Sequence, residues 1–166
     1  QQSYGNYYFK VGDGTTTYTS FNGGLIVDTW QFLTLSYDGV NMKSYLNAVL
    51  QDTLAVPNIT YGTSATWNPF YIGRTSGNSQ YLSGNIDEVS LFNSELSATD
   101  ITSIYNSGVP NNLNDNGLTA PTTWYRMGEA ANYAGGEWTL TDQGSGSNNG
   151  SSLTLPPEAI STDVPS

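Results

Sequence analysis

Two adjacent carboxylates, Asp87 and Glu88, are the residues of this sequence closest to a catalytic pair. Cleavage of a glycosidic bond needs an acid and a base that reach the same cleft. Side chains of neighbouring strand residues point to opposite faces of a sheet, so this pair meets that requirement only if a bulge separates them. Asp38 or Glu95 could partner one of the two, but nothing in the sequence places either beside them. We therefore predict that the protein is not an enzyme.

The overall composition excludes several other kinds of chemistry. The chain of 166 residues has no cysteine and no histidine, so disulfides, thiolate metal sites and cysteine catalysis are excluded and the commonest general base is missing. Its formal charge of −10 argues against binding to nucleic acid or to an anionic membrane. No apolar run approaches the length of a membrane span. The acidic balance leaves carboxylates free to bind a cation, and the length fits one domain.

Residues 81–108 form the best-defined element of the sequence. Apolar residues alternate through the first half, with a slip in parity between Ile86 and Val89, which predicts a half-buried strand interrupted by a β-bulge. In the second half, Ser97 is a favourable N-cap and is followed by apolar residues at helical spacing. These features predict one short helix over residues 97–107, closed by a glycine in the left-handed conformation.

Short β-prone runs separated by Gly, Asn and Asp fill most of the remaining chain. We expect strands at residues 4–11, 15–21, 24–27, 30–37, 42–50 and 68–74. The turns between them include Asp13-Gly14 and Asp38-Gly39, whose aspartates we expect to set hairpin geometry rather than bind a ligand. Together with the abundant Tyr, Thr and Gly, these runs predict an all-β sandwich of about a dozen short strands.

Three stretches of the sequence resemble laminin-G-like domains of the concanavalin A-like group. Residues 84–105 resemble their closing signature, in which an Ile-Asp-Glu-Val strand leads into a short helix. Residues 29–50 resemble their central hairpin, with Phe32 where a histidine is frequent, and residues 68–74 resemble the strand before the closing signature. The resemblance implies an antiparallel jelly-roll β-sandwich. It does not by itself imply a function, because this fold carries lectins, glycosidases, adhesion modules and inert spacers.

Residues 111–155 resemble the opening segment of such a domain, although here they follow the closing signature. Two explanations are open at this point: the segment completes the sandwich as a permuted first strand, or it begins a second repeat of a longer tandem protein. We favour the first, since an isolated strand would leave its apolar residues without a core. The predicted organisation is therefore one domain over residues 1–155 and an extended tail over residues 156–166.

The resemblance also implies a calcium site, because concanavalin A-like domains often hold one ion where the opening segment meets the signature strand. Carried over to this sequence, the ligands would be Asp142 and Asp87, with further oxygens from Gly84 and Asn85. Ca²⁺ takes about six to eight oxygen ligands, and the Gly- and Asn-rich loop after Asp142 allows carbonyls to turn inward. The alternative is that Asp142 caps a turn and Asp87 accepts backbone N–H bonds.

Aromatic side chains in the expected loops are the candidates for ligand binding. The sequence holds 12 Tyr and 4 Trp, and sugars are bound by aromatic faces together with Asn, Asp and Gln side chains that read the hydroxyls. Tyr18, Tyr61, Trp67 and Tyr81 lie in or near these loops. The alternative is that they are ordinary strand residues with one face packed.

We predict a non-catalytic recognition or adhesion module that binds a glycan or a cell-surface receptor on an extracellular or virion surface. The alternative is a purely structural subunit, such as a phage decoration, fibre or filament protein, whose faces bind copies of itself. Residues 124–129, 142–150 and 161–165 resemble segments of repeated structural proteins of bacteriophages. The Pro-rich tail and the out-of-order opening segment favour a piece of a larger assembly. A loop-rimmed patch with exposed aromatics would indicate a binder, whereas buried apolar area above roughly 1,000 Å² between copies would indicate self-assembly.

Overall fold

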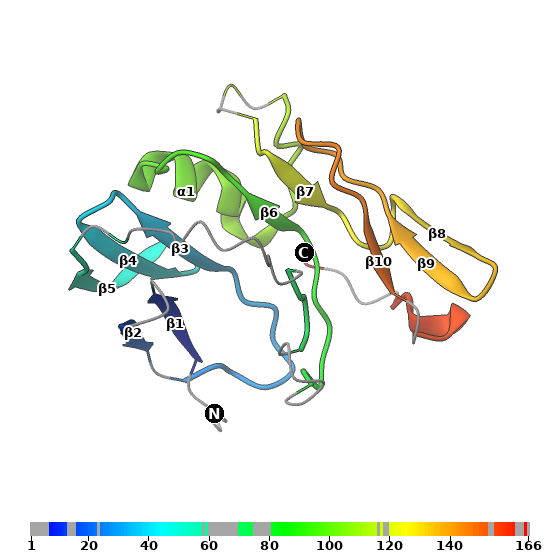
Figure 1. The fold of residues 1–166 in the computed structure, drawn as a ribbon, viewed down its shortest axis with the longest axis horizontal. Coiled ribbons are helices and arrows are strands. Elements are labelled where there is room, and N and C mark those ends of the chain that lie inside the picture. The colour runs from blue at the N-terminus through cyan, green and yellow to red at the C-terminus, as the bar shows by residue number, and fades with distance from the viewer. Residues whose placement is uncertain are drawn as a thin grey trace. The chain divides into compact units, whose positions relative to one another are not determined.

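A computed structural model describes residues 7–12, 16–22, 24–57, 59, 70–74, 81–115, 117, 120–152, 155–161 and 165. The chain forms two compact units, whose elements are labelled in Figure 1. Unit 1 contains Gln1–Gly62, Phe92–Pro121 and Pro165–Ser166, and unit 2 contains Thr63–Leu91 and Thr122–Val164. Each unit is therefore assembled from segments that lie far apart in the sequence.

Unit 1 holds five strands of the described part of the chain, in two antiparallel sheets. They are β1 (Tyr7–Gly12), β2 (Thr17–Asn22), β3 (Leu33–Tyr37), β4 (Asn41–Leu46) and β5 (Val49–Ala55). β1 pairs with β2, and β3, β4 and β5 follow one another in the second sheet. A buried polar contact joins the two sheets, because the Ser20 hydroxyl donates to Asp52 Oδ2 (2.8 Å) and lies 3.1 Å from the Ser44 hydroxyl.

The predicted helix is confirmed as α1 (Ala98–Tyr105), followed by a 3-10 turn at Asn106–Gly108. Ser97 and Asp100 form a capping box at its start, which satisfies backbone N–H groups that would otherwise lack partners. The helix ends earlier than predicted, because Asn106 already adopts the left-handed conformation with φ of 43°. Within the described residues, no helix is long and apolar enough to cross a membrane.

Two side-chain contacts and one buried residue link α1 and its approach to the sheet of β3, β4 and β5. Ile101 of the helix is completely buried. The Phe32 ring, just before β3, stacks on Tyr105 with centroids 5.7 Å apart. Lys43 of β4 forms an ion pair of 2.7 Å with Glu95, which precedes the helix. The helix therefore covers the face of the sheet to which Phe32 points.

Asp38 closes the turn between β3 and β4, which is the hairpin role predicted for it. Its Oδ1 atom accepts hydrogen bonds from Val40 N (2.7 Å) and Asn41 N (2.6 Å). These backbone donors lower the pKa of Asp38 to about 2. The Asp13-Gly14 turn lies outside the described residues.

The turn between β4 and β5 contains a strained alanine. Asn47 and Ala48 have positive φ values of 49° and 63°, as in a type I′ turn, whose second position favours glycine. Because alanine in this conformation costs about 1 kcal/mol, we expect Ala48→Gly to raise the melting temperature by about 2–4 °C in scanning calorimetry. Ala55→Gly, at the end of β5 where φ is not positive, should instead lower it. An equal response at both positions would contradict the argument.

Unit 2 also holds five strands of the described chain in two antiparallel sheets. They are β6 (Val89–Leu91), β7 (Thr123–Tyr125), β8 (Ala131–Ala134), β9 (Glu137–Leu140) and β10 (Gly150–Ser152), and a 3-10 turn follows at Pro157–Ala159. β6 pairs with β7, and the other sheet has the order β10-β9-β8. A strand of the closing signature thus pairs with a strand of the segment that resembles a domain opening. The domain limits at residues 155 and 156 stay predictions.

One of the predicted strands is absent from the described residues, and two are shorter than predicted. Residues 81–88 form no strand, because the ladder starts at Val89, directly after Glu88, whose φ of 53° breaks the regular pleat. Glu88 lies inside the interval where the slip in parity predicted a bulge. Residues 70–74 form no strand either. All the strands of the described residues nevertheless lie in antiparallel ladders, and these residues contain a single short α-helix. The predicted all-β class is therefore confirmed.

The predicted strand at residues 24–27 is reduced to an isolated bridge at Ile26. The side-chain amide of Gln31 explains this, because it takes the backbone groups that a ladder would use. Gln31 Nε2 donates to Ile26 O (3.0 Å), and Gln31 Oε1 accepts from Ile26 N (3.3 Å).

Candidate functional site

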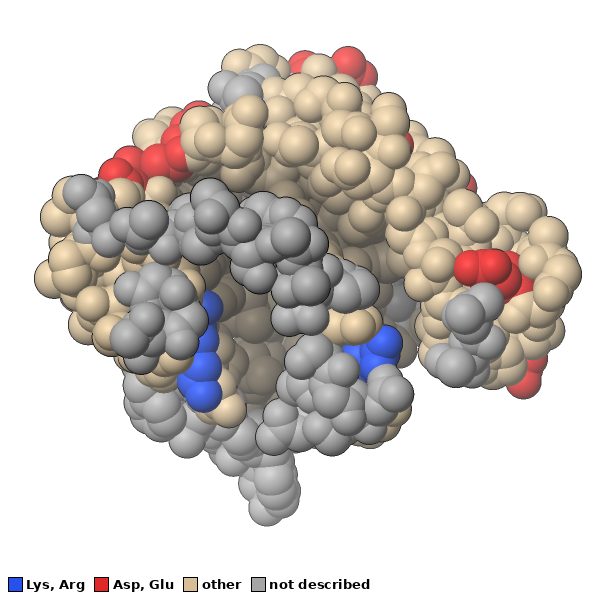
Figure 2. All heavy atoms as spheres, in the orientation of Figure 1, with Lys and Arg blue, Asp and Glu red and all other residues tan. Residues whose placement is uncertain are grey.

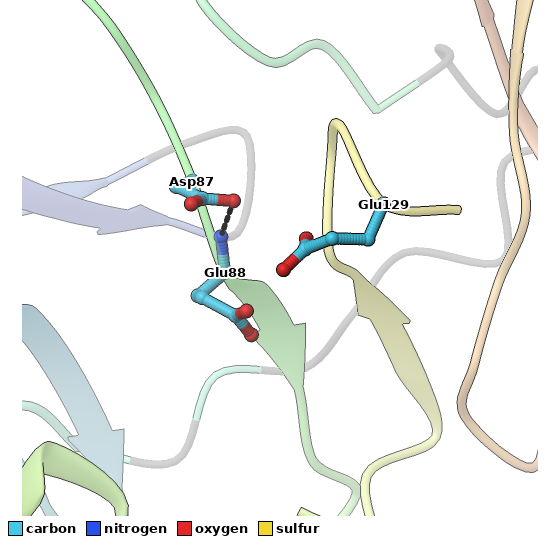
Figure 3. A group of neighbouring side chains, drawn as sticks. All are labelled: Asp87, Glu88 and Glu129. Carbon is cyan, nitrogen blue, oxygen red and sulfur yellow. Dashed lines mark hydrogen bonds between the residues drawn. The ribbon is translucent and has the colours of Figure 1, made fainter. Parts of the chain in front are cut away.

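Three carboxylates of unit 2 converge on one point. Asp87, Glu88 and Glu129 each offer a ligand oxygen, and these oxygens all lie within 4.8 Å of one another. Figure 3 shows Asp87 and Glu88 on the segment that leads into β6, with Glu129 facing them from the turn after β7. Asp87 and Glu88 are half-buried and Glu129 is exposed. We call this group the carboxylate cluster.

The left-handed backbone at Glu88 explains why two neighbouring residues reach the same place. On a regular strand their side chains would point to opposite faces, but φ of 53° at Glu88 removes that alternation. Asp87 Oδ1 accepts a hydrogen bond from Glu88 N (2.9 Å), which holds the turn of the chain. Asp87 and Glu88 therefore do not diverge, because the backbone is irregular at Glu88, inside the interval where the slip in parity predicted a bulge.

The strand pairing explains the approach of Glu129. Val89 of β6 lies opposite Tyr125 of β7. Because the pair is antiparallel, the residues before Val89 run beside the residues after Tyr125. Glu88 consequently meets Arg126, and Glu129 follows within the same turn. Sequence reasoning missed Glu129, although the predicted contact between the opening-like segment and the signature strand was the signal that could have found it.

One arginine and one tryptophan hold the carboxylate cluster. Glu88 Oε2 accepts from Trp124 Nε1 (2.7 Å), and Glu88 Oε1 accepts from Arg126 Nε (3.2 Å). The other end of the guanidinium donates to Glu129 Oε1 (2.9 Å), and the guanidinium carbon lies 5.4 Å from the centroid of the Trp124 ring. With three carboxylates and one guanidinium, the formal charge of the group is −3 + 1 = −2.

Burial shifts the titration of the two half-buried acids. Burial raises the pKa of Glu88, although the hydrogen bonds from Trp124 and Arg126 oppose the increase. Burial also raises the pKa of Asp87, and the negative charge of Glu129 adds to this effect. A raised carboxyl pKa means that the surroundings disfavour the ionised form. Added positive charge would therefore stabilise the carboxylate cluster.

Asp142, the other predicted calcium ligand, organises a loop of unit 2. Its Oδ1 atom accepts from Trp124 N and Gly144 N (both 2.8 Å), and its Oδ2 atom accepts from Asn148 N (2.7 Å). Burial alone would raise the pKa of Asp142, but these backbone donors and the Thr123 hydroxyl lower it below the ordinary value. This is the turn-capping role that the sequence left as the alternative. The pairing of Asp142 with Asp87 around one ion stays a prediction.

The remaining predicted ligands, Gly84 and Asn85, lie on the exposed segment just before Ile86. Gly84 is exposed and has open space where a side chain would begin. The Asn85 side chain is also exposed, and its Nδ2 atom donates to the Ser161 hydroxyl at 3.4 Å. Their role as ligands stays a prediction.

The predicted aromatic ligand-binding residues fall into three classes. Tyr61 and Trp67 lie outside the described residues, and Tyr18 is a half-buried residue of β2. Tyr81 is 66% exposed, as the prediction of a binding residue requires. Phe70, which sequence reasoning did not single out, is 63% exposed on a segment linked to this region by the bond from Leu82 N to Gly73 O (2.7 Å).

Comparison with known families gives one result. A family model described as the concanavalin A-like lectin/glucanases superfamily matches residues 1–102 of the 166-residue chain. No curated protein and no solved structure matches it. The matched range includes Asp87 and Glu88 but ends before Arg126 and Glu129. One of the three acids of the carboxylate cluster, Glu129, and the counter-ion Arg126 thus lie beyond the family match.

Proposed function

Because the chain belongs to the concanavalin A-like lectin/glucanases superfamily, we propose that it is a non-catalytic recognition module that binds glycans with the help of a calcium ion. Domains of this kind are typically carbohydrate-binding or adhesion modules without catalytic activity, and they are commonly extracellular. The observation that carries the proposal is the convergence of Asp87, Glu88 and Glu129 within 4.8 Å. We place the protein on an extracellular or virion surface.

The residues of the carboxylate cluster fit calcium by their chemistry. All the ligand atoms are carboxylate oxygens, which hard cations such as Ca²⁺ prefer. Three carboxylates supply negative charge and several of the oxygens that the ion needs. The net charge of −2, counted with Arg126, matches one divalent cation. Bound Ca²⁺ would supply coordination positions for sugar hydroxyls. Asp87, Glu88 and Glu129 would hold the ion, and Arg126 would keep Glu129 turned toward Glu88.

The hydrogen bonds of the carboxylate cluster favour binding over hydrolysis. Both oxygens of Glu88 already accept hydrogen bonds, from Trp124 and Arg126, and Arg126 also occupies Glu129. A general acid must instead have its proton free for the leaving group of the substrate. Glycoside hydrolysis is the second candidate function, because Asp87 and Glu88 reach the same place. If the wild-type protein releases reducing sugar from a glycan and the Asp87→Asn variant does not, that result would favour hydrolysis.

The glycan surface that we propose contains Tyr81 and Phe70. Both rings are more than half exposed, and exposed aromatic faces stack on the apolar C–H surface of sugars. On the face drawn in Figure 2, most of the described surface carries neither an acidic nor a basic side chain.

Calcium is expected to stabilise the protein. At a concentration about a hundred times the dissociation constant, a bound ion adds about 2.7 kcal/mol, which is roughly 5–10 °C in melting temperature for a chain of this size. Thermal unfolding in EDTA and then in excess Ca²⁺ measures this shift. Asp87→Asn and Glu129→Gln should each abolish it, whereas Glu158→Gln, at an exposed acid of unit 2, should keep it.

The same experiment separates the two calcium sites. A shift that survives in Glu129→Gln but disappears in Asp87→Asn would favour the site predicted from sequence, with Asp142 in place of Glu129. The absence of any shift in the wild-type protein would contradict both.

Glycan binding is expected to depend on the exposed aromatic residues and on the ion. On a glycan array, Tyr81→Ala and Phe70→Ala should each weaken binding about tenfold, since one stacked ring contributes about 1–2 kcal/mol. Tyr8→Ala removes another ring that is more than half exposed, from β1 of unit 1, and this variant should bind normally. Wild-type protein that binds no glycan but sediments as a large oligomer would contradict the proposal and favour the structural-subunit alternative.

A further inference from the structure

Two buried hydroxyl groups of β3 have no hydrogen-bond partner among the protein atoms. Thr34 Oγ1 and Ser36 Oγ are shielded from solvent, and only Tyr7 OH shares this condition among the described residues. Ser36 as a whole is 7% exposed. A buried hydroxyl without a partner destabilises a fold, so such groups are normally satisfied by protein atoms or by an ordered water molecule.

The two hydroxyls point to the same side of the sheet, toward α1. Thr34 and Ser36 alternate along β3, so their side chains share a face, and Phe32 is in phase with them. The Phe32 ring stacks on Tyr105 of α1, which identifies that face as the one that the helix covers. The residue opposite Thr34 on β4 is Tyr45, which is buried. Both hydroxyls therefore lie in the interface between sheet and helix of unit 1.

We propose that one buried water molecule bridges Thr34 Oγ1 and Ser36 Oγ in this interface. Alternate residues of a strand are about 6.5–7 Å apart, and a water that bonds to two hydroxyls at a near-tetrahedral angle spans about 4.5 Å between them. Side chains that lean toward each other close this difference. The site suits a neutral ligand that both donates and accepts hydrogen bonds, because each of the two hydroxyls can do both. Water is the smallest ligand of that class and the usual partner of buried polar groups that lack a protein partner.

The proposal predicts coupling between the two positions. Thr34→Val or Ser36→Ala alone removes one partner of the water and leaves the other hydroxyl with a poorly held molecule, so each should lower the melting temperature by about 2–4 °C. The double variant needs no water, and its shift should be smaller than the sum of the two single shifts. Water-to-protein nuclear Overhauser effects should detect a long-lived water at Thr34 in the wild type and not in the double variant.

Matched variants control for the side-chain changes themselves. Thr53→Val on β5 and Ser151→Ala on β10 make the same replacements at exposed strand positions and should change the melting temperature by less than about 1 °C. If the bridge is absent, each buried replacement removes an unsatisfied hydroxyl, so both single variants would raise the melting temperature and their effects would add. That result would overturn the proposal.

Discussion

Asp142→Asn is expected to destabilise the protein by about 3 kcal/mol at pH 7, although its side chain keeps nearly the same size. The carboxylate accepts backbone hydrogen bonds from Trp124, Gly144 and Asn148. An asparagine retains one acceptor oxygen and directs its NH₂ group at a backbone donor. At least one N–H group then loses its partner, and the charge-assisted bonds become neutral ones. Urea unfolding, followed by tryptophan fluorescence, measures the difference.

The effect of Asp142→Asn should vanish in acid. The pKa of Asp142 is lower in the folded protein than its ordinary value of 3.8. A lowered folded pKa contributes stability that is present above the unfolded value and is lost as the pH falls through the folded one. The difference between wild type and variant should therefore be full at pH 7 and shrink below about pH 4. A difference that stays constant down to pH 2 would contradict the role of the carboxylate.

A matched replacement at Asp28 controls for the loss of charge. Asp28 is exposed, and its φ of 54° is one that asparagine adopts as readily as aspartate. Asp28→Asn removes the same charge without a set of backbone donors around it. We therefore expect the free energy of unfolding to change by no more than about 0.5 kcal/mol.

The elements that could be predicted from the sequence are those set by local chemistry. Ser97 caps α1 as predicted, because the bonds of a capping box join residues only three positions apart. Asp38 likewise closes its hairpin through the two N–H groups that follow it. The end of α1 was misplaced by two residues, because Asn106 takes the left-handed position that we expected of Gly108. Asparagine tolerates that conformation, so the two residues compete for it.

The carboxylate cluster could not be predicted in full, because its geometry depends on pairing between distant segments. The slip in parity around Glu88 signalled an irregular backbone, but not that it would turn Glu88 beside Asp87. Glu129 reaches them only because β7 pairs with β6 in one particular register, and a shift of one residue would change the face on which each side chain lies. The composition of the segment is compatible with several registers, so sequence alone does not select one.

Trp124→Phe is expected to cost about 3 kcal/mol at pH 7 and to make the stability of the protein strongly dependent on pH. Trp124 is only 2% exposed, so a smaller ring leaves a cavity. The variant also removes the indole N–H that donates to Glu88 Oε2 at 2.7 Å. A half-buried carboxylate is then left with Arg126 as its main partner.

The sign of the pH dependence follows from the direction of the pKa shift. The folded pKa of Glu88 already lies above its ordinary value of 4.5, and the bond from Trp124 is one of the effects that hold it down. Without that bond, the folded pKa rises further. A raised folded pKa costs stability above that pKa, and the cost is relieved as the pH falls toward the unfolded value. The penalty of Trp124→Phe should therefore decrease as the pH is lowered from 7 to 5.

Two further variants separate this effect from simple loss of packing. In the background of Glu88→Gln, position 88 does not titrate, so Trp124→Phe should lower the free energy of unfolding only by its cavity cost, at every pH. The effects of the two variants on this free energy should couple by about 1 kcal/mol at pH 7. Trp138→Phe makes the same ring change at another buried tryptophan, whose Nε1 donates to the backbone oxygen of Pro156 at 2.9 Å. That acceptor carries no charge, so its penalty should not vary with pH. Equal pH profiles for the two tryptophan variants would show that Glu88 is not ionised against Trp124, and would remove one of the charges on which the calcium proposal depends.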